Sequence, residues 1–235
     1  MNGAPVFCVV ARDQGIAFLR KAFADIKRKL GSSLNVEMTS LLPNDVSRDI
    51  CWKKIESLPD HSSVMIFIHG GMGYLTMSRD GARVAAGGMI DIPASVCKNK
   101  HMIIVSCNSD SLVERLKSNG ALSAVGFGLI DFACEDLYYH EESIAVTRKP
   151  GKRPTRECFA KYLFRRALAD TIIYCESRQL SAKDFVYFFH YFSNFYADKL
   201  LLSEEIDGRH INITRRKRIL IAQFMQKMKE SIICS

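Results

Sequence analysis

The sequence lacks the features that would anchor it in a membrane or tie it to a familiar cofactor. No run of about 18 apolar residues occurs, so we expect no membrane-spanning helix and no membrane partner. The segment Met1–Ala11 has no charged stretch ahead of its short apolar run, so no signal peptide is expected. The glycine-rich pieces do not form Gly-x-Gly-x-x-Gly at a first strand–helix turn, and no Walker-type loop occurs. A dinucleotide cofactor is therefore not expected.

The eight cysteines contain no Cys-x-x-Cys pair, which leaves a metal site without support. Their spacing is irregular, and Cys8, Cys51, Cys134 and Cys175 lie inside apolar stretches, where cysteine behaves as a small hydrophobe. A reducing cytoplasm is the simplest compartment for such a chain, and at least one thiol remains available there for chemistry.

Basic residues exceed acidic ones, 33 against 25, but the excess is local. Residues 1–147 carry 15 basic and 16 acidic side chains, residues 148–166 carry 8 and 1, and residues 167–235 carry 10 and 8. A uniformly basic surface would favour nucleic acid, whereas here nucleic-acid binding is only a minor option. We expect the basic loop over residues 148–156, which Pro and Gly interrupt, to be a docking surface or a self-processing site.

The order of apolar segments predicts an α/β fold with a mostly parallel sheet flanked by helices. Strands without polar alternation are expected to be buried on both faces. The second half is helical throughout, so we expect one domain over residues 1–235 with a helical C-terminal layer. The expected strands are Pro5–Ala11, Leu34–Thr39, Ser63–Ile68, His101–Ser106 and Leu122–Phe127. A hairpin is expected to join Tyr74–Met77 to Ala82–Ala86. The expected helices are Gln14–Leu30, Asn44–Leu58, Ser109–Asn119, Thr155–Ser177, Ser181–Ser203 and Asn212–Ile233.

Two chemically reactive residues follow predicted strands at their carboxyl ends. His69 follows the third strand and precedes Gly70–Gly73, and Cys107 follows the fourth. Ligands gather at this edge of an open parallel sheet, where neighbouring strands lie about 5 Å apart. A thiolate beside an imidazole is a nucleophile, and the helix expected from Ser109 would favour it further. A strand-terminal cysteine is also a common buried hydrophobe, and His-Gly-Gly is a common tight turn.

The two segments together resemble a known peptidase family. The stretches IFIHGGMGYLTM and IIVSCNSDSLVERLKSNGALSAVGFG resemble the CHAT family of caspase-like cysteine peptidases, in which strand-His-Gly, a hairpin, strand-Ser-Ala-Cys and a helix ending in Gly-Ala follow one another. Gly120-Ala121 stands in the expected place, and Phe192–Ile206 looks like a later helix of the family. The resemblance implies a caspase-like fold, a His69–Cys107 dyad, and backbone amides of Gly70 and Cys107 as oxyanion donors.

Two positions depart from the family's pattern. Asp110 stands near a position that is usually glycine, and Val105 stands where several relatives carry an aspartate that binds a basic P1 side chain. Asp110 or Asp131 could supply that charge from another position, although each also fits a helix N-cap or a loop residue.

The sequence therefore predicts a cytoplasmic cysteine endopeptidase that acts on a protein substrate and requires no cofactor. By resemblance, such peptidases look like bacterial effectors, for instance in antiphage defence, which a partner or a signal activates; a homo-oligomer is an option. One alternative is a caspase-like adaptor without activity. A second is an α/β-hydrolase-like esterase. Two observations speak against it: the Gly-x-Ser-x-Gly nucleophile motif of that fold is absent, and Asp207 and His210, the candidates for the other triad residues, lie close together in one polar loop.

The segment Asp184–Tyr196 is unusually aromatic, and we expect it to be buried between the sheet and another helix. His190 within it then belongs to the core or to an interface. Aromatic side chains in excess of what the core holds would form an exposed stripe and a dimer or partner surface.

Overall fold

The computed structural model describes residues 5–12, 16–31, 36–71, 74–76, 90–128, 130, 143–145, 156–211 and 213–235. Within these ranges the main sheet has six strands in the order β12–β7–β6–β3–β1–β2. Every neighbouring pair is parallel except β12 with β7. The predicted mostly parallel α/β architecture is therefore confirmed. The strands are β1 (Val6–Ala11), β2 (Val36–Leu41), β3 (Ser63–Phe67), β6 (His101–Val105), β7 (Ser123–Phe127) and β12 (Ile232–Cys234).

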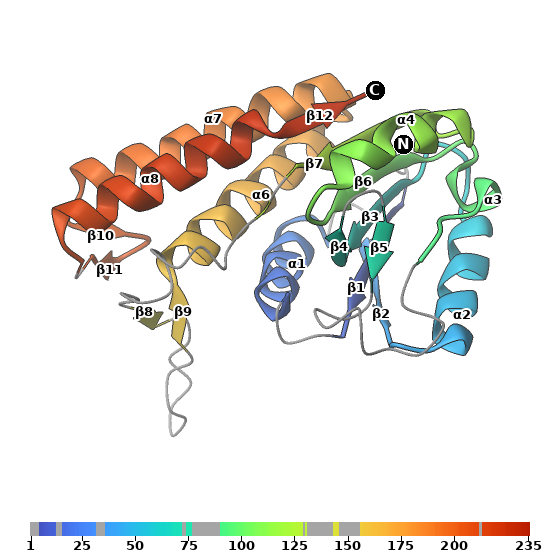
Figure 1. Ribbon diagram of the computed structural model, residues 1–235, viewed down its shortest axis with the longest axis horizontal. Helices are drawn as coiled ribbons and strands as arrows, with labels where there is room; N and C mark the ends of the chain where they lie inside the picture. Colours follow the sequence, from blue (N-terminus) through green and yellow to red (C-terminus); the bar gives the residue numbers. More distant parts are fainter. Residues whose placement is uncertain are drawn as a thin grey trace.

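The helices form two groups around this sheet. One group contains α1, α6, α7 and α8, each packed against the next, and the three long C-terminal helices lie side by side as a layer (Figure 1). In the other group, α3 packs against both α2 and α4. The helices are α1 (Ala17–Leu30), α2 (Asp45–Glu56), α3 (Ala94–Cys97), α4 (Val113–Ser118), α6 (Phe159–Arg178), α7 (Ala182–Leu202) and α8 (Arg215–Glu230). Among the helices described, none is long and apolar enough to span a bilayer.

Local sequence signals explain most of these elements. Every residue of β1 and β3 is buried, as expected for central strands whose apolar runs show no polar alternation. The Asn44 side chain caps α2 by accepting from the Ser47 N–H at 2.8 Å. Ser181 and Asp184 form a capping box at the start of α7. Both helix starts agree with the sequence prediction to within one residue.

The end of the chain was predicted wrongly as helix. The helix α8 stops at Glu230, and Ile232–Cys234 form β12, which pairs with β7. Because β7 would otherwise be the edge of the sheet, its free backbone groups offer a non-local partner that sequence periodicity does not reveal. The expected start at Thr155 is likewise wrong, since Arg156–Cys158 form β9 opposite β8 (Ser143–Ala145) and α6 begins at Phe159.

The short pieces after β3 and β6 also differ from expectation. His69–Gly71 form a strand, β4, which pairs with β5 (Tyr74–Thr76). The hairpin partner expected at Ala82–Ala86 lies outside the described residues. The helix expected over Ser109–Asn119 begins instead as a 3-10 turn, Ser109–Leu112, and continues as the six-residue α4.

The aromatic helix α7 is buried along one side only. Phe189 meets Phe127 of β7 and Phe164 of α6 edge to face, with ring centroids 5.2 and 5.9 Å apart, which confirms its predicted place between sheet and helix. On the opposite side, Tyr187, Tyr191 and Phe195 are 65%, 54% and 40% exposed. The expected exposed aromatic stripe is present.

Candidate active site

The sheet register brings His69 and Cys107 to the same edge. The strands β3 and β6 are adjacent and parallel, with Phe67 opposite Val105. His69 lies two residues after Phe67, and Cys107 lies two residues after Val105. Both residues therefore stand at the same level of the sheet. The Ile68 N–H donates to the Val105 carbonyl at 3.2 Å, which continues the pairing beyond the strand ends. The two strands are therefore neighbours, which is the arrangement that a joint role of His69 and Cys107 needs.

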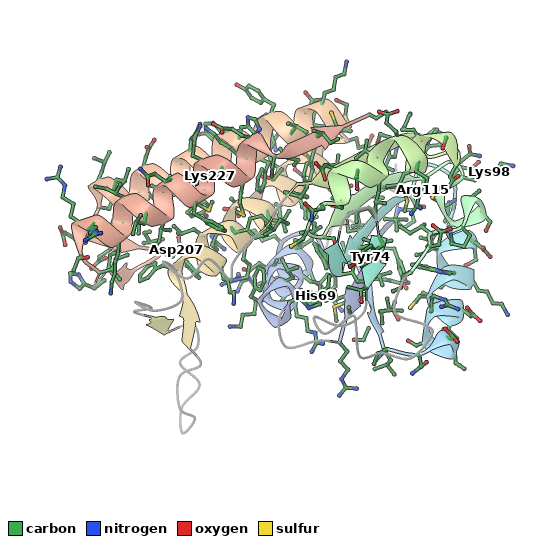
Figure 2. The ribbon with its side chains drawn as sticks, viewed as in Figure 1. His69, Tyr74, Lys98, Arg115, Asp207 and Lys227 are labelled. Atoms are coloured by element: carbon green, nitrogen blue, oxygen red, sulfur yellow. The ribbon has the colours of Figure 1, made fainter. Side chains whose placement is uncertain are left out.

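Gly70 places the His-Gly segment directly against the backbone that carries Cys107. A Cβ atom at Gly70 would lie 2.3 Å from the Cys107 carbonyl oxygen and 2.2 Å from Ser106 Oγ, closer than non-bonded atoms approach. Only glycine therefore fits at this contact without a backbone shift. His69 and Tyr74 lie on the β4–β5 hairpin at this edge (Figure 2). The side chains of His69 and Cys107 are each partly exposed, so solvent reaches both.

The Cys107 thiol lies half-buried at the margin of the core. Its Sγ donates to the Ile130 carbonyl at 3.2 Å. The next residue, Asn108, adopts a left-handed backbone conformation with φ of 55°, and its N–H donates to the Gly128 carbonyl at 2.9 Å. The turn that carries the thiol is therefore fixed against the segment that leaves β7.

Ser109 fixes the same turn from inside. Its hydroxyl is fully buried within hydrogen-bond distance of the Ile104 and Ser106 carbonyls, at 2.8 and 2.9 Å, and it accepts from the Phe127 N–H at 2.9 Å. Gly126 leaves the space for this packing, since a Cβ there would lie 2.4 Å from the Ser109 carbonyl oxygen. Sequence reasoning missed this role, because a serine before a helix signals only an N-cap.

We expect Ser109→Ala to lower the free energy of unfolding by about 1–3 kcal/mol, because the Phe127 N–H and two carbonyls lose a buried partner. Urea denaturation followed by fluorescence measures this change. Ser111→Ala is the matched control: the Ser111 hydroxyl is exposed and donates only to the Asn108 carbonyl at 2.8 Å. Equal effects of the two substitutions would contradict the assigned role.

Four other thiols are kept in the unreactive protonated form by burial. Burial raises the pKa of Cys97 to about 11 and of Cys175 to about 12, and it also raises the pKa of Cys8 and of Cys51. These cysteines carry a negligible thiolate fraction near neutral pH. Among the cysteines whose side chains are described, only Cys107 and Cys234 are partly exposed, and none forms a disulfide.

The acidic residues considered for substrate binding have different outcomes. Asp110 lies inside the 3-10 turn that follows Cys107, with its side chain partly buried. The cap of that turn is Asn108, so Asp110 is not the N-cap. Asp131 lies outside the described residues, as does the basic loop up to residue 155. In the described part of the chain, no three His, Cys, Asp or Glu side chains are grouped to hold a metal ion.

Asp207, which an esterase triad would need, has a structural role. It lies in the turn between β10 (Glu205–Ile206) and β11 (Arg209–His210), at the end of the helical layer where α7 ends and α8 begins (Figure 2). Its carboxylate accepts from Tyr162 Oη at 2.5 Å and pairs with Arg166 Nε at 3.1 Å. Asp207 therefore anchors the β10–β11 hairpin to α6.

Neither the comparison of this sequence with protein-family models nor the comparison with curated proteins gives a significant match.

Proposed function

We propose that this protein is a cysteine endopeptidase with a caspase-like fold, in which Cys107 is the nucleophile and His69 transfers the proton. The observation that carries the proposal is the shared edge: β3 and β6 are in register, and Gly70 packs on the Cys107 carbonyl. This arrangement keeps an imidazole and a partly exposed thiol on adjacent backbones, as the cysteine–histidine chemistry of acyl transfer requires.

In this mechanism Cys107 Sγ attacks the scissile carbonyl carbon and forms a thioester as the peptide C–N bond breaks. The proton delivered by His69 goes to the leaving amine. The backbone N–H groups of Gly70 and Cys107 are proposed to hold the oxyanion, a role that close backbone approach after His69 favours. Water then hydrolyses the thioester and frees the thiol.

The thiol's own contact supports activation by a partner or a signal. Cys107 Sγ donates to the Ile130 carbonyl, so the sulfur must give up this contact to reach a substrate carbonyl. Any ligand or protein that moves the segment at Ile130 would release it. Asp110, on the turn after Cys107, remains the described candidate for binding a basic P1 side chain.

Selective thiol labelling tests the proposal. We expect iodoacetamide at pH 7 to modify Cys107 at least about tenfold faster than Cys234, because the imidazole at the same edge favours the thiolate. Peptide mapping by mass spectrometry measures each rate. His69→Gln is expected to bring the Cys107 rate down to that of Cys234. Equal rates at the two sites in the unaltered protein would contradict the peptidase.

A catalytically silent adaptor is the second candidate, and the exposed stripe of Tyr187, Tyr191 and Phe195 on α7 favours it. Such a protein would show no selective reactivity at Cys107. The same labelling experiment therefore separates the two functions.

A further inference from the structure

A cavity lies at the opposite edge of the sheet from His69 and Cys107. It has a volume of about 530 Å³, within the range of small-molecule sites, and it opens between the strand starts and the turn that joins α6 to α7. Its floor is lined by the first residues of β3, β6 and β7, which are Ser63, His101 and Ser123. The proposed peptidase mechanism uses none of these residues.

The charge of this cavity is unbalanced. Glu176 on α6 lines it, and none of the described lining residues is a lysine or an arginine, although the whole chain has a net charge of +8. The carboxylate accepts from Ser63 Oγ at 3.1 Å, and it forms no ion pair with any residue that the structure describes. A carboxylate that is largely shielded from solvent and has no cation beside it is costly, so it either keeps a proton or takes a cation from outside.

The His101 imidazole does not supply that cation. Burial, together with the neighbouring His61 and Lys117, lowers the pKa of His101, which favours its neutral form. Its Nδ1 lies 2.9 Å from Ser123 Oγ, and the two imidazole rings are 6.1 Å apart. A neutral imidazole and a serine hydroxyl can both accept hydrogen bonds from a bound N–H group.

The walls suit an apolar body. Ile103, Val125 and Phe185 are buried and line the cavity beside the polar groups. A ligand that fills it would place an aliphatic or aromatic part on these side chains and an N–H-bearing head at Glu176.

We propose that this cavity binds a small organic cation, an amidinium or alkylammonium with an apolar body, whose N–H groups pair with the Glu176 carboxylate. An anion would find no cationic side chain among the lining residues, and a neutral ligand would leave the carboxylate uncompensated. The site is independent of the proposed peptidase chemistry, so either can fail without the other.

Binding must be linked to protons. Burial raises the pKa of Glu176 to about 7, and a cation pairs only with the ionised form. The titratable and charged groups around the carboxyl include Cys8 of β1 and Cys175 of α6, whose thiols stay protonated, and Asp184 of α7 near Cys175. They also include the imidazoles of His101 and His61, with Lys117 of α4 near His101. Affinity should therefore rise about tenfold from pH 6 to pH 8, with about 0.9 proton released per cation at pH 6.

Three probes of one shape and different charge test the inference on the full chain: benzamidinium, neutral benzamide and benzoate. We expect calorimetry to show binding of benzamidinium alone, with the proton release and pH trend given above. NMR should show shifts in the ring signals of His61 and His101 and none in those of His69. Glu176→Gln is expected to weaken binding at least about tenfold, whereas Glu114→Gln, at an exposed position on α4, leaves it unchanged.

Several results would overturn the proposal. The proposal fails when benzoate or benzamide binds as tightly as benzamidinium, or when benzamidinium does not bind at about 10 mM. It also fails when the affinity for benzamidinium does not change with pH. NMR shifts at His69, with none at His61 and His101, would place the bound cation at the other edge of the sheet. The pH trend and the NMR shifts use the unaltered protein, so the test stands even when Glu176→Gln does not fold.

Discussion

On the proposed mechanism, cleavage of protein substrates is expected to fall by about 10³-fold or more when Cys107 is replaced by alanine, because the proposed nucleophile is gone. The fold should survive, since the thiol is only half-buried and its hydrogen bond to the Ile130 carbonyl is weak. Mass spectrometry of a proteome-derived peptide library, digested with and without each variant, measures the loss. A melting curve checks that the variant is folded.

Two further variants sharpen this experiment. His69→Gln should lose nearly as much activity as Cys107→Ala, and the double variant should lose little more, because residues that act as one unit are not additive. Cys234→Ala, which changes the second of the two partly exposed cysteines among those described, should cleave normally. Retained cleavage by Cys107→Ala would refute the peptidase mechanism.

Gly70→Ala is expected to reduce cleavage by about 100-fold or more, although residue 70 contributes no side chain to the chemistry. The added methyl group would stand 2.3 Å from the Cys107 carbonyl oxygen, so one of the two backbones must move. A displacement of about 1 Å between reacting groups has an effect of this size. Overpacking should also lower the free energy of unfolding by about 1–3 kcal/mol.

Ser106→Ala is the informative companion to this variant. Its hydroxyl is buried without a hydrogen-bond partner among the described residues, so its removal should leave cleavage close to normal. The double variant Gly70→Ala with Ser106→Ala should stay impaired, because the contact with the Cys107 carbonyl oxygen remains. Normal activity and melting temperature in Gly70→Ala would show that the hairpin and the Cys107 turn are not closely packed.

Local patterns were sufficient for most elements of this fold. The apolar runs at Val6–Ala11 and Ser63–Phe67 have the length and composition of buried strands, and Asn44 and Ser181 marked helix starts through hydrogen bonds made within one turn. Each of these signals depends on residues close in the chain. The sequence also placed His69 and Cys107 at strand ends, because the apolar runs stop there.

Partners distant in the chain decided the rest. The strand Ile232–Cys234 forms only because β7 offers an edge to it, about a hundred residues away in sequence. The segment after Cys107 begins as a 3-10 turn where a longer helix was expected. There the Ser109 hydroxyl lies within hydrogen-bond distance of the Ile104 and Ser106 carbonyls and accepts from the Phe127 N–H. The cation cavity is likewise non-local, since Glu176 meets Ser63 across 113 positions. The sequence alone determined which residues end the strands, and tertiary structure decided which of them meet, because register and packing join segments that no local pattern connects.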